Sequence, residues 1–110
     1  MELTTYEKDS IFVVKPKEKR IDSNSAPGFK KEMIKFIEEG KKNIVLNLSD
    51  VDFIDSSGLG VIVSILKRVR KEGDIKLCCA KESVKSVFEL TKLDKVFEFF
   101  YSEEEAVDSF

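Results

Sequence analysis

Residues 51–62 read Val-Asp-Phe-Ile-Asp-Ser-Ser-Gly-Leu-Gly-Val-Ile, a strand-like run that passes directly into a helix. The helical pattern continues to about Glu72, where Gly73 stops it. At roughly 100° per residue, six apolar side chains fall in one sector about 160° wide and predict the face that packs on the core. They are Leu59, Ile62, Val63, Ile65, Leu66 and Val69, with Val61 at the border of the sector.

The opposite sector of this helix begins with small residues and becomes basic toward the C-terminus. The small residues are Ser57, Gly60 and Ser64, and the basic ones are Lys67, Arg68 and Lys71. Cations near the end of a helix complement its dipole, so the basic end alone requires no functional explanation.

Strands and helices alternate along the rest of the chain. Strand candidates, rich in β-branched and aromatic residues, occupy residues 3–8, 11–14, 43–48, 75–79 and 96–100. Further helices are expected at residues 26–40 behind Ser25 as a cap, around Val84, Val87, Phe88 and Leu90, and after the capping-box pattern that begins at Ser102. This order predicts an α/β fold, and 110 residues suffice for one domain, residues 1–110.

Composition excludes several classes of function. The chain has no histidine, which removes Ser-His-Asp and Cys-His catalysis and the usual zinc sites. A net charge of −2 argues against a broad basic nucleic-acid face. With no membrane-spanning apolar run and no signal peptide, the sequence predicts a cytoplasmic protein. The adjacent Cys78 and Cys79 are expected to be reduced, because neighbours on a strand are poorly placed for a disulfide.

The start of the helix after Asp55 is the segment that carries a functional signal. Gly58 and Gly60 lie in its first turns, where each glycine costs up to about 1 kcal/mol relative to alanine. One interpretation is structural: Asp55, Ser56 or Ser57 caps the helix and the glycines fit a tight turn. The other is a phosphoacceptor serine on a partner-binding surface, where an added phosphate repels the partner. Catalysis is disfavoured, because neither a G-x-S-x-G nor a G-x-x-x-x-G-K-[ST] motif is present.

Residues 51–62 closely resemble the signature of the STAS domain, specifically that of the bacterial anti-sigma factor antagonists. Residues 43–48 are similar to the central strand of the family, residues 89–97 to its C-terminal L-T-G-L-x-x-x-F segment, and residues 102–107 to its closing helix. The resemblance covers most of residues 8–110. It implies a STAS-type mixed sheet of about four or five strands with helices packed mainly on one face.

Carried over onto this sequence, the resemblance places the phosphorylated position on Ser56. It implies a partner-binding surface that consists of Asp22, Asp55, Ser57, Gly58, Leu59, Gly60, Val61 and Ser64. Asp22 is the only match to the family's G-E-L-D loop, and Lys92 replaces a common glycine. The implied partner is an anti-sigma factor with serine kinase activity, which the unphosphorylated protein binds so that a sigma factor is released. A serine phosphatase reverses the phosphorylation, and no cofactor, metal, membrane or nucleic acid takes part. The free protein is expected to be a monomer.

Two other functions remain open. The chain could be a STAS docking subunit of a larger signalling assembly, which a monomeric mass and the absence of a large complex would oppose. It could also be a nucleotide-binding regulatory module, which calorimetry with ATP and GTP would test. The sequence offers no nucleotide motif.

Overall fold

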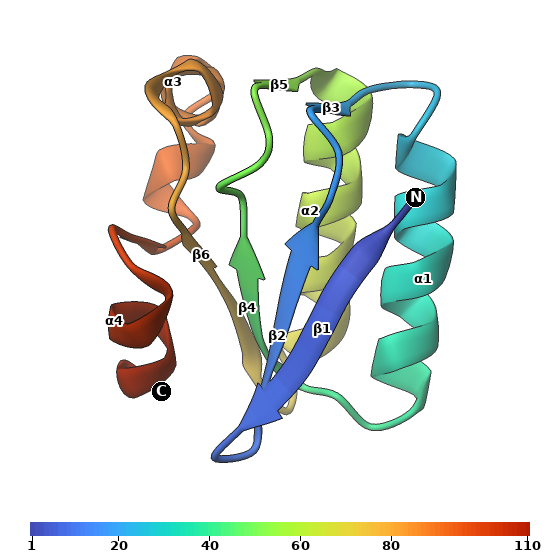
Figure 1. The fold of residues 1–110 in the computed structure, drawn as a ribbon, viewed down its shortest axis with the longest axis vertical. Coiled ribbons are helices and arrows are strands. Elements are labelled where there is room, and N and C mark those ends of the chain that lie inside the picture. The colour runs from blue at the N-terminus through green and yellow to red at the C-terminus, as the bar shows by residue number, and fades with distance from the viewer.

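The computed structural model covers residues 1–110 and has strands and helices in alternation after an N-terminal hairpin (Figure 1). The strands are β1 (Leu3–Lys8), β2 (Ile11–Pro16), β3 (Arg20–Ile21), β4 (Asn43–Asn47), β5 (Phe53–Ile54), β6 (Asp74–Cys78) and β7 (Phe99–Phe100). The helices are α1 (Ala26–Glu38), α2 (Ser56–Val69), α3 (Glu82–Leu90) and α4 (Glu103–Asp108), with a 3-10 turn η1 (Leu93–Lys95). None of these helices has the length and apolar character needed to cross a membrane.

Five strands form one mixed sheet in the order β1-β2-β4-β6-β7. The hairpin pair β1–β2 is antiparallel, whereas β2, β4, β6 and β7 are mutually parallel. In this register Val13 pairs with Val45, which pairs in turn with Lys76. The predicted mixed sheet is therefore confirmed. A separate parallel pair, β3–β5, lies beyond the carboxyl ends of β2 and β4, directly beside the start of α2 (Figure 1).

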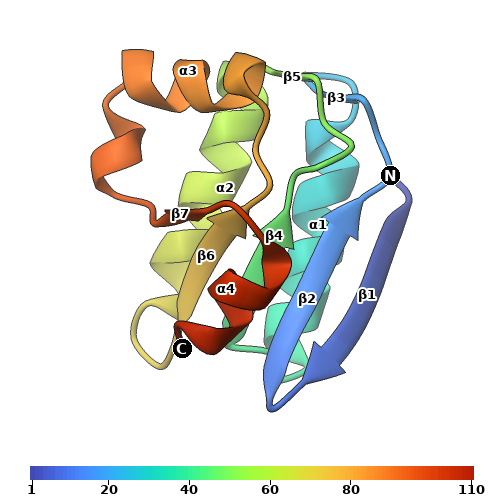
Figure 2. The ribbon, with the colours of Figure 1, turned by 60° about the vertical axis from the view of Figure 1, so that its left-hand side comes forward.

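Helices cover the sheet unequally. α1 and α2 pack side by side on one face, and the main core between them and the sheet includes Phe29, Met33, Ile44, Leu46 and Ile62. The short helix α4 lies alone on the opposite face, as Figure 2 shows. There its Ala106 and Val107 cover a smaller cluster that consists of Ile11, Val13, Val45 and Cys78. The prediction that helices pack mainly on one face is confirmed, with α4 as the exception.

The predicted amphipathic face of α2 is also confirmed. Its core side holds Leu59, Ile62, Ile65, Leu66 and Val69, all buried, with Val63 half-buried. The predicted Ser102 cap of α4 is present as well: the Ser102 hydroxyl accepts a hydrogen bond from the Glu105 amide at 3.1 Å and donates one to the Glu105 carboxylate at 3.1 Å. Local sequence patterns of this kind are reliable because both partners lie within one helical turn.

The structure differs from the sequence-based expectations in four local details. Residues 15–24, where no strand was predicted, contain the end of β2 and all of strand β3. Ser25 occupies the N-cap position of α1, but its hydroxyl makes no cap; it donates instead to the Arg20 carbonyl at 3.0 Å. The helix predicted around Leu90 is present as α3, but Leu90 itself is 84% exposed and takes no part in the core.

The fourth difference concerns the last strand, which begins at Phe99 and not at Val96. The chain makes the turn η1 first, which lets the Phe97 ring pack edge-on against the Phe88 ring at 5.7 Å. Lys92, at the position of the family's common glycine, adopts a left-handed conformation with φ 63°. Glycine adopts this left-handed conformation without steric cost, whereas the side chain of lysine makes it strained.

Candidate functional site

The start of α2 is held by the carboxylate of Asp55. One carboxylate oxygen accepts hydrogen bonds from the amides of Ser57 at 2.9 Å and Gly58 at 3.1 Å. The other accepts from the Ser23 amide at 3.2 Å, in the loop between β3 and α1. Asp55 is thus the N-cap of α2 and also ties two loops together, in agreement with the structural interpretation of this residue.

Gly58 is required by the close approach of the β3 backbone. A β-carbon at this position would lie 2.6 Å from the Ile21 carbonyl oxygen and 2.8 Å from side-chain carbons of Ile21 and Ile54. The same carbonyl accepts the Asp55 amide at 3.2 Å. The β3–β5 pair and the first turn of α2 therefore pack tightly together. This packing fixes the position of Ser56.

Ser56 is exposed at the first position of α2, as the functional hypothesis requires. Ser57 and Gly60 are exposed beside it, and Ser64, about two turns further along the helix, is half-buried. Nothing lies within 4 Å of the β-carbon position of Gly60, so this glycine opens onto solvent. The structure brings these four residues together in one exposed strip, here named the Ser56 strip.

Three residues predicted on the same surface are buried instead: Gly58, Leu59 and Val61. Gly58 packs against β3, and Leu59 and Val61 are only 5% and 7% exposed because both belong to the main core. These residues lie on the inner side of α2, beneath the Ser56 strip, and offer little surface to a partner. The burial of Leu59 agrees with its predicted place on the core face, and the partner-binding role that the resemblance implies for these three residues stays a prediction.

Asp22 lies one residue before the Ser23 amide that binds Asp55, so the structure brings its loop to the site. Its carboxylate accepts hydrogen bonds from the amides of Asn24 at 3.0 Å and Ser25 at 3.2 Å. The Ser25 amide, followed by the Asn24 amide and the Arg20 guanidinium, lowers the pKa of Asp22. Asp22 is half-buried and shapes the loop. Sequence reasoning overlooked Ser23, although the run Asp-Ser-Asn-Ser is typical of a turn with side-chain to backbone hydrogen bonds.

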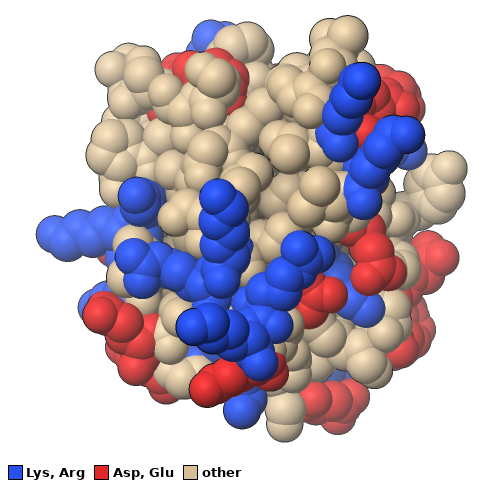
Figure 3. All heavy atoms as spheres, turned by 180° about the vertical axis from the view of Figure 1, so that it is seen from behind, with Lys and Arg blue, Asp and Glu red and all other residues tan.

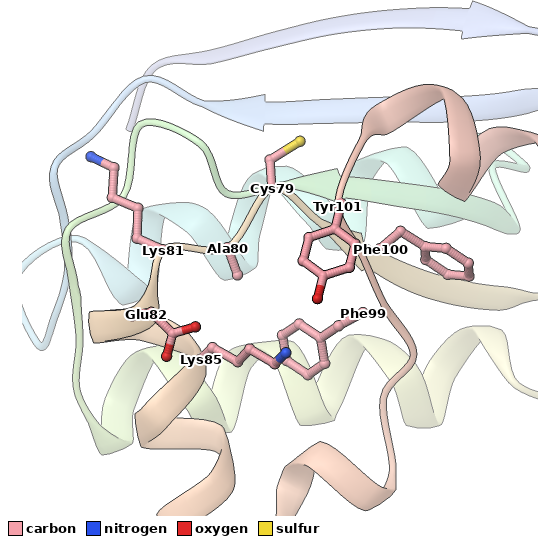
Figure 4. Close-up of a pocket in the computed structure, with 8 residues that line it drawn as sticks. All are labelled: Cys79, Ala80, Lys81, Glu82, Lys85, Phe99, Phe100 and Tyr101. Carbon is pink, nitrogen blue, oxygen red and sulfur yellow. The ribbon is translucent and has the colours of Figure 1, made fainter.

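A hollow of about 440 Å³ lies elsewhere, at the carboxyl ends of β6 and β7. Figure 4 shows the Tyr101 ring on one side of it, Glu82 and Lys85 on the other, and the Cys79 thiol pointing away. None of the predicted site residues lines this hollow, and its wall contains no glycine. Both cysteines are free, and burial raises the pKa of the Cys78 thiol, so Cys78 is not an activated nucleophile.

Comparison with known proteins places this geometry in a family. A family model described as the STAS domain matches residues 2–106. The anti-sigma-B factor antagonist of Bacillus subtilis is 34% identical over 79 residues, which cover 71% of this chain and 72% of that protein.

Two solved structures share the fold. The crystal structure of a candidate anti-sigma factor antagonist from Thermotoga maritima is 34% identical, with a TM-score of 0.92 over 97% of this chain and 92% of that one. The phosphorylated form of the Bacillus cell-fate determinant SpoIIAA, 20% identical, has a TM-score of 0.74 over 98% of both chains. The chain belongs to the STAS domain family.

Proposed function

We propose that this protein is an anti-sigma factor antagonist whose unphosphorylated form binds an anti-sigma factor and so releases a sigma factor. Phosphorylation at Ser56 switches it off. The observation that carries the proposal is the exposed Ser56 at the first position of α2, next to a strip of small residues. The relatives named as antagonists of anti-sigma factors support the same function.

The surface around Ser56 suits close contact with a protein. Ser57, Gly60 and Ser64 present little side-chain bulk, so the main chain of α2 can come near a partner. Asp22 and Asp55 stand at the edge of this surface and are held by backbone amides. Both carboxylates are thus set in place before a partner binds, which reduces the entropy lost on association.

Phosphorylation can change this surface without unfolding the domain. A kinase would transfer the γ-phosphoryl group of ATP to Ser56 Oγ, with loss of the hydroxyl proton and release of ADP. The helix is capped by Asp55 and not by the Ser56 hydroxyl, so the cap remains after the reaction. The phosphate carries about −1.5 to −2 charges and stands at the positive end of the helix dipole, next to the Asp55 carboxylate. In a packed interface, that bulk and charge oppose the partner.

The anti-sigma factor itself is the kinase in this proposal, and a separate serine phosphatase restores the unphosphorylated form. The antagonist supplies the acceptor hydroxyl and the recognition surface and performs no catalysis of its own. We place this exchange in the cytoplasm, where sigma factors act, with the free antagonist as a monomer. The family match and the exposed serine support these assignments.

Sigma-factor release is the direct test of this function. When the purified protein is added to a complex of the organism's anti-sigma factor with its sigma factor, gel filtration should show free sigma factor and a new antagonist complex. The protein phosphorylated at Ser56 should release no sigma factor, because the phosphate blocks the contact. A protein that binds the anti-sigma factor without releasing sigma factor would be a docking subunit, contrary to the proposal.

A further inference from the structure

Basic side chains gather on the helical face of the molecule. Figure 3 shows Lys and Arg side chains in a band across the middle and lower part of this face, whereas the centre of the upper part is uncharged and charged side chains there lie toward its sides. Three exposed cations lie at the C-terminal end of α2: Lys67 and Arg68 in its last turn, and Lys71 two residues beyond its end. They are here named the basic triad. The triad takes part in none of the five ion pairs of the structure.

The basic triad continues the Ser56 strip toward the C-terminal end of α2 and into the turn that follows it. At 1.5 Å per residue, Lys67 lies about 15 Å along the helix axis from Ser57, and Lys71 lies just past the end of the helix. A standard protein interface covers about 800 Å² on each partner, which is broad enough to include both regions. A protein that contacts the Ser56 strip along α2 therefore meets the triad at the edge of the same contact.

We infer that the partner surface carries carboxylates opposite Lys67, Arg68 and Lys71, so that the triad steers and orients the partner as it binds. This inference rests on the proposed function and specifies the chemistry of its partner. Three cations without an intramolecular carboxylate are free to meet charges on another molecule. Charges at the rim of an interface act mainly on the association rate, and they act through long-range attraction that salt screens.

An acidic protein fits this face better than a nucleic acid or an anionic membrane. The uncharged Ser56 strip adjoins the triad and would gain nothing from a row of phosphates. Glu72 places one carboxylate in the shallow hollow that Lys41, Lys42, Arg68 and Lys71 also line. The whole chain also carries a net charge of −2.

The test compares two triple variants of equal charge. One replaces the triad (Lys67→Gln, Arg68→Gln, Lys71→Gln), and the control replaces three exposed lysines outside α2 that also lack ion pairs (Lys8→Gln, Lys92→Gln, Lys95→Gln). Stopped-flow or surface-based kinetics with the purified anti-sigma factor of the organism give the association rate at several salt concentrations. The triad variant should associate about tenfold more slowly at low salt, with a flatter salt dependence, while the control stays near the unsubstituted protein.

Each outcome decides between the alternatives. Equal association rates and salt slopes for the triad variant and the control would overturn the inference but leave the proposed function intact, provided that the unsubstituted protein binds. Failure of the unsubstituted protein to bind any anti-sigma factor of the organism would overturn the proposed function itself. Triad-dependent binding to phosphatidylserine vesicles or to duplex DNA, with unchanged association to the anti-sigma factor, would assign the triad to that other class of partner.

Discussion

Replacing Ser56 with aspartate should weaken binding to the anti-sigma factor by about tenfold to hundredfold. The substitution puts a permanent charge on an exposed position that the partner covers, and the expected loss corresponds to about 1.4–2.7 kcal/mol of binding free energy. Full phosphorylation should weaken binding further, because the phosphate carries up to two charges and greater bulk. Isothermal titration calorimetry with the purified anti-sigma factor measures both effects.

Two variants serve as controls for this prediction. Ser56→Ala removes the hydroxyl without adding charge and should bind nearly as well as the unsubstituted protein. Ser10→Asp makes the same charge change at the β1–β2 turn, at the far end of the sheet from the start of α2 (Figure 1). Its φ of 69° lies in the left-handed region, which aspartate tolerates better than most residues. Equal losses of affinity for Ser10→Asp and Ser56→Asp would place the contact surface elsewhere.

Gly58→Ala should lower the free energy of unfolding by about 2 kcal/mol, since overpacking against a fixed backbone costs about 1–3 kcal/mol. The added β-carbon would lie 2.6 Å from the Ile21 carbonyl oxygen. A shift of β3 would disturb its pairing with β5, and a shift of either β3 or α2 would strain the hydrogen bond from the Asp55 amide to the same carbonyl. Urea unfolding followed by circular dichroism gives the change in free energy.

Gly60→Ala is the matched control, in the same helix and two residues away. Its β-carbon would meet nothing within 4 Å, so alanine should raise the stability by up to about 1 kcal/mol through helix propensity. The same methyl group would stand on the Ser56 strip, and binding to the anti-sigma factor should weaken. If Gly58→Ala were as stable as Gly60→Ala, the close packing described for Gly58 would be wrong.

Sequence patterns predicted most of the fold because most of its signals are local. The core face of α2 follows from side chains three or four residues apart, and the cap of α4 from Ser102 and Glu105. Strand β3 was not predicted, because two residues are too few to show a strand periodicity. It forms by pairing with β5, more than thirty residues later in the chain. Leu90 belongs to the predicted helix, yet at the last position of α3 its side chain is 84% exposed, which the apolar pattern alone does not reveal.

The site was predicted less completely than the fold. That Ser56 and Ser57 start a helix is evident from Asp55 and the glycines that follow, and the structure agrees. The different roles of the two glycines were not predictable, because they depend on whether the β3 backbone or solvent faces each one. The hydrogen bond from the Ser23 amide to the Asp55 carboxylate joins residues 32 positions apart, so no local sequence pattern predicts it.

The site of phosphorylation is the most direct measurement. The protein is incubated with its kinase anti-sigma factor and ATP, and intact mass and peptide mapping locate the label in the unsubstituted protein, in Ser56→Ala and in Ser57→Ala. We expect a single phosphate on Ser56 in the unsubstituted and Ser57→Ala proteins and no label in Ser56→Ala. A phosphate that remains after Ser56→Ala, or one that maps to Ser57, would contradict the assignment of Ser56 as the switch.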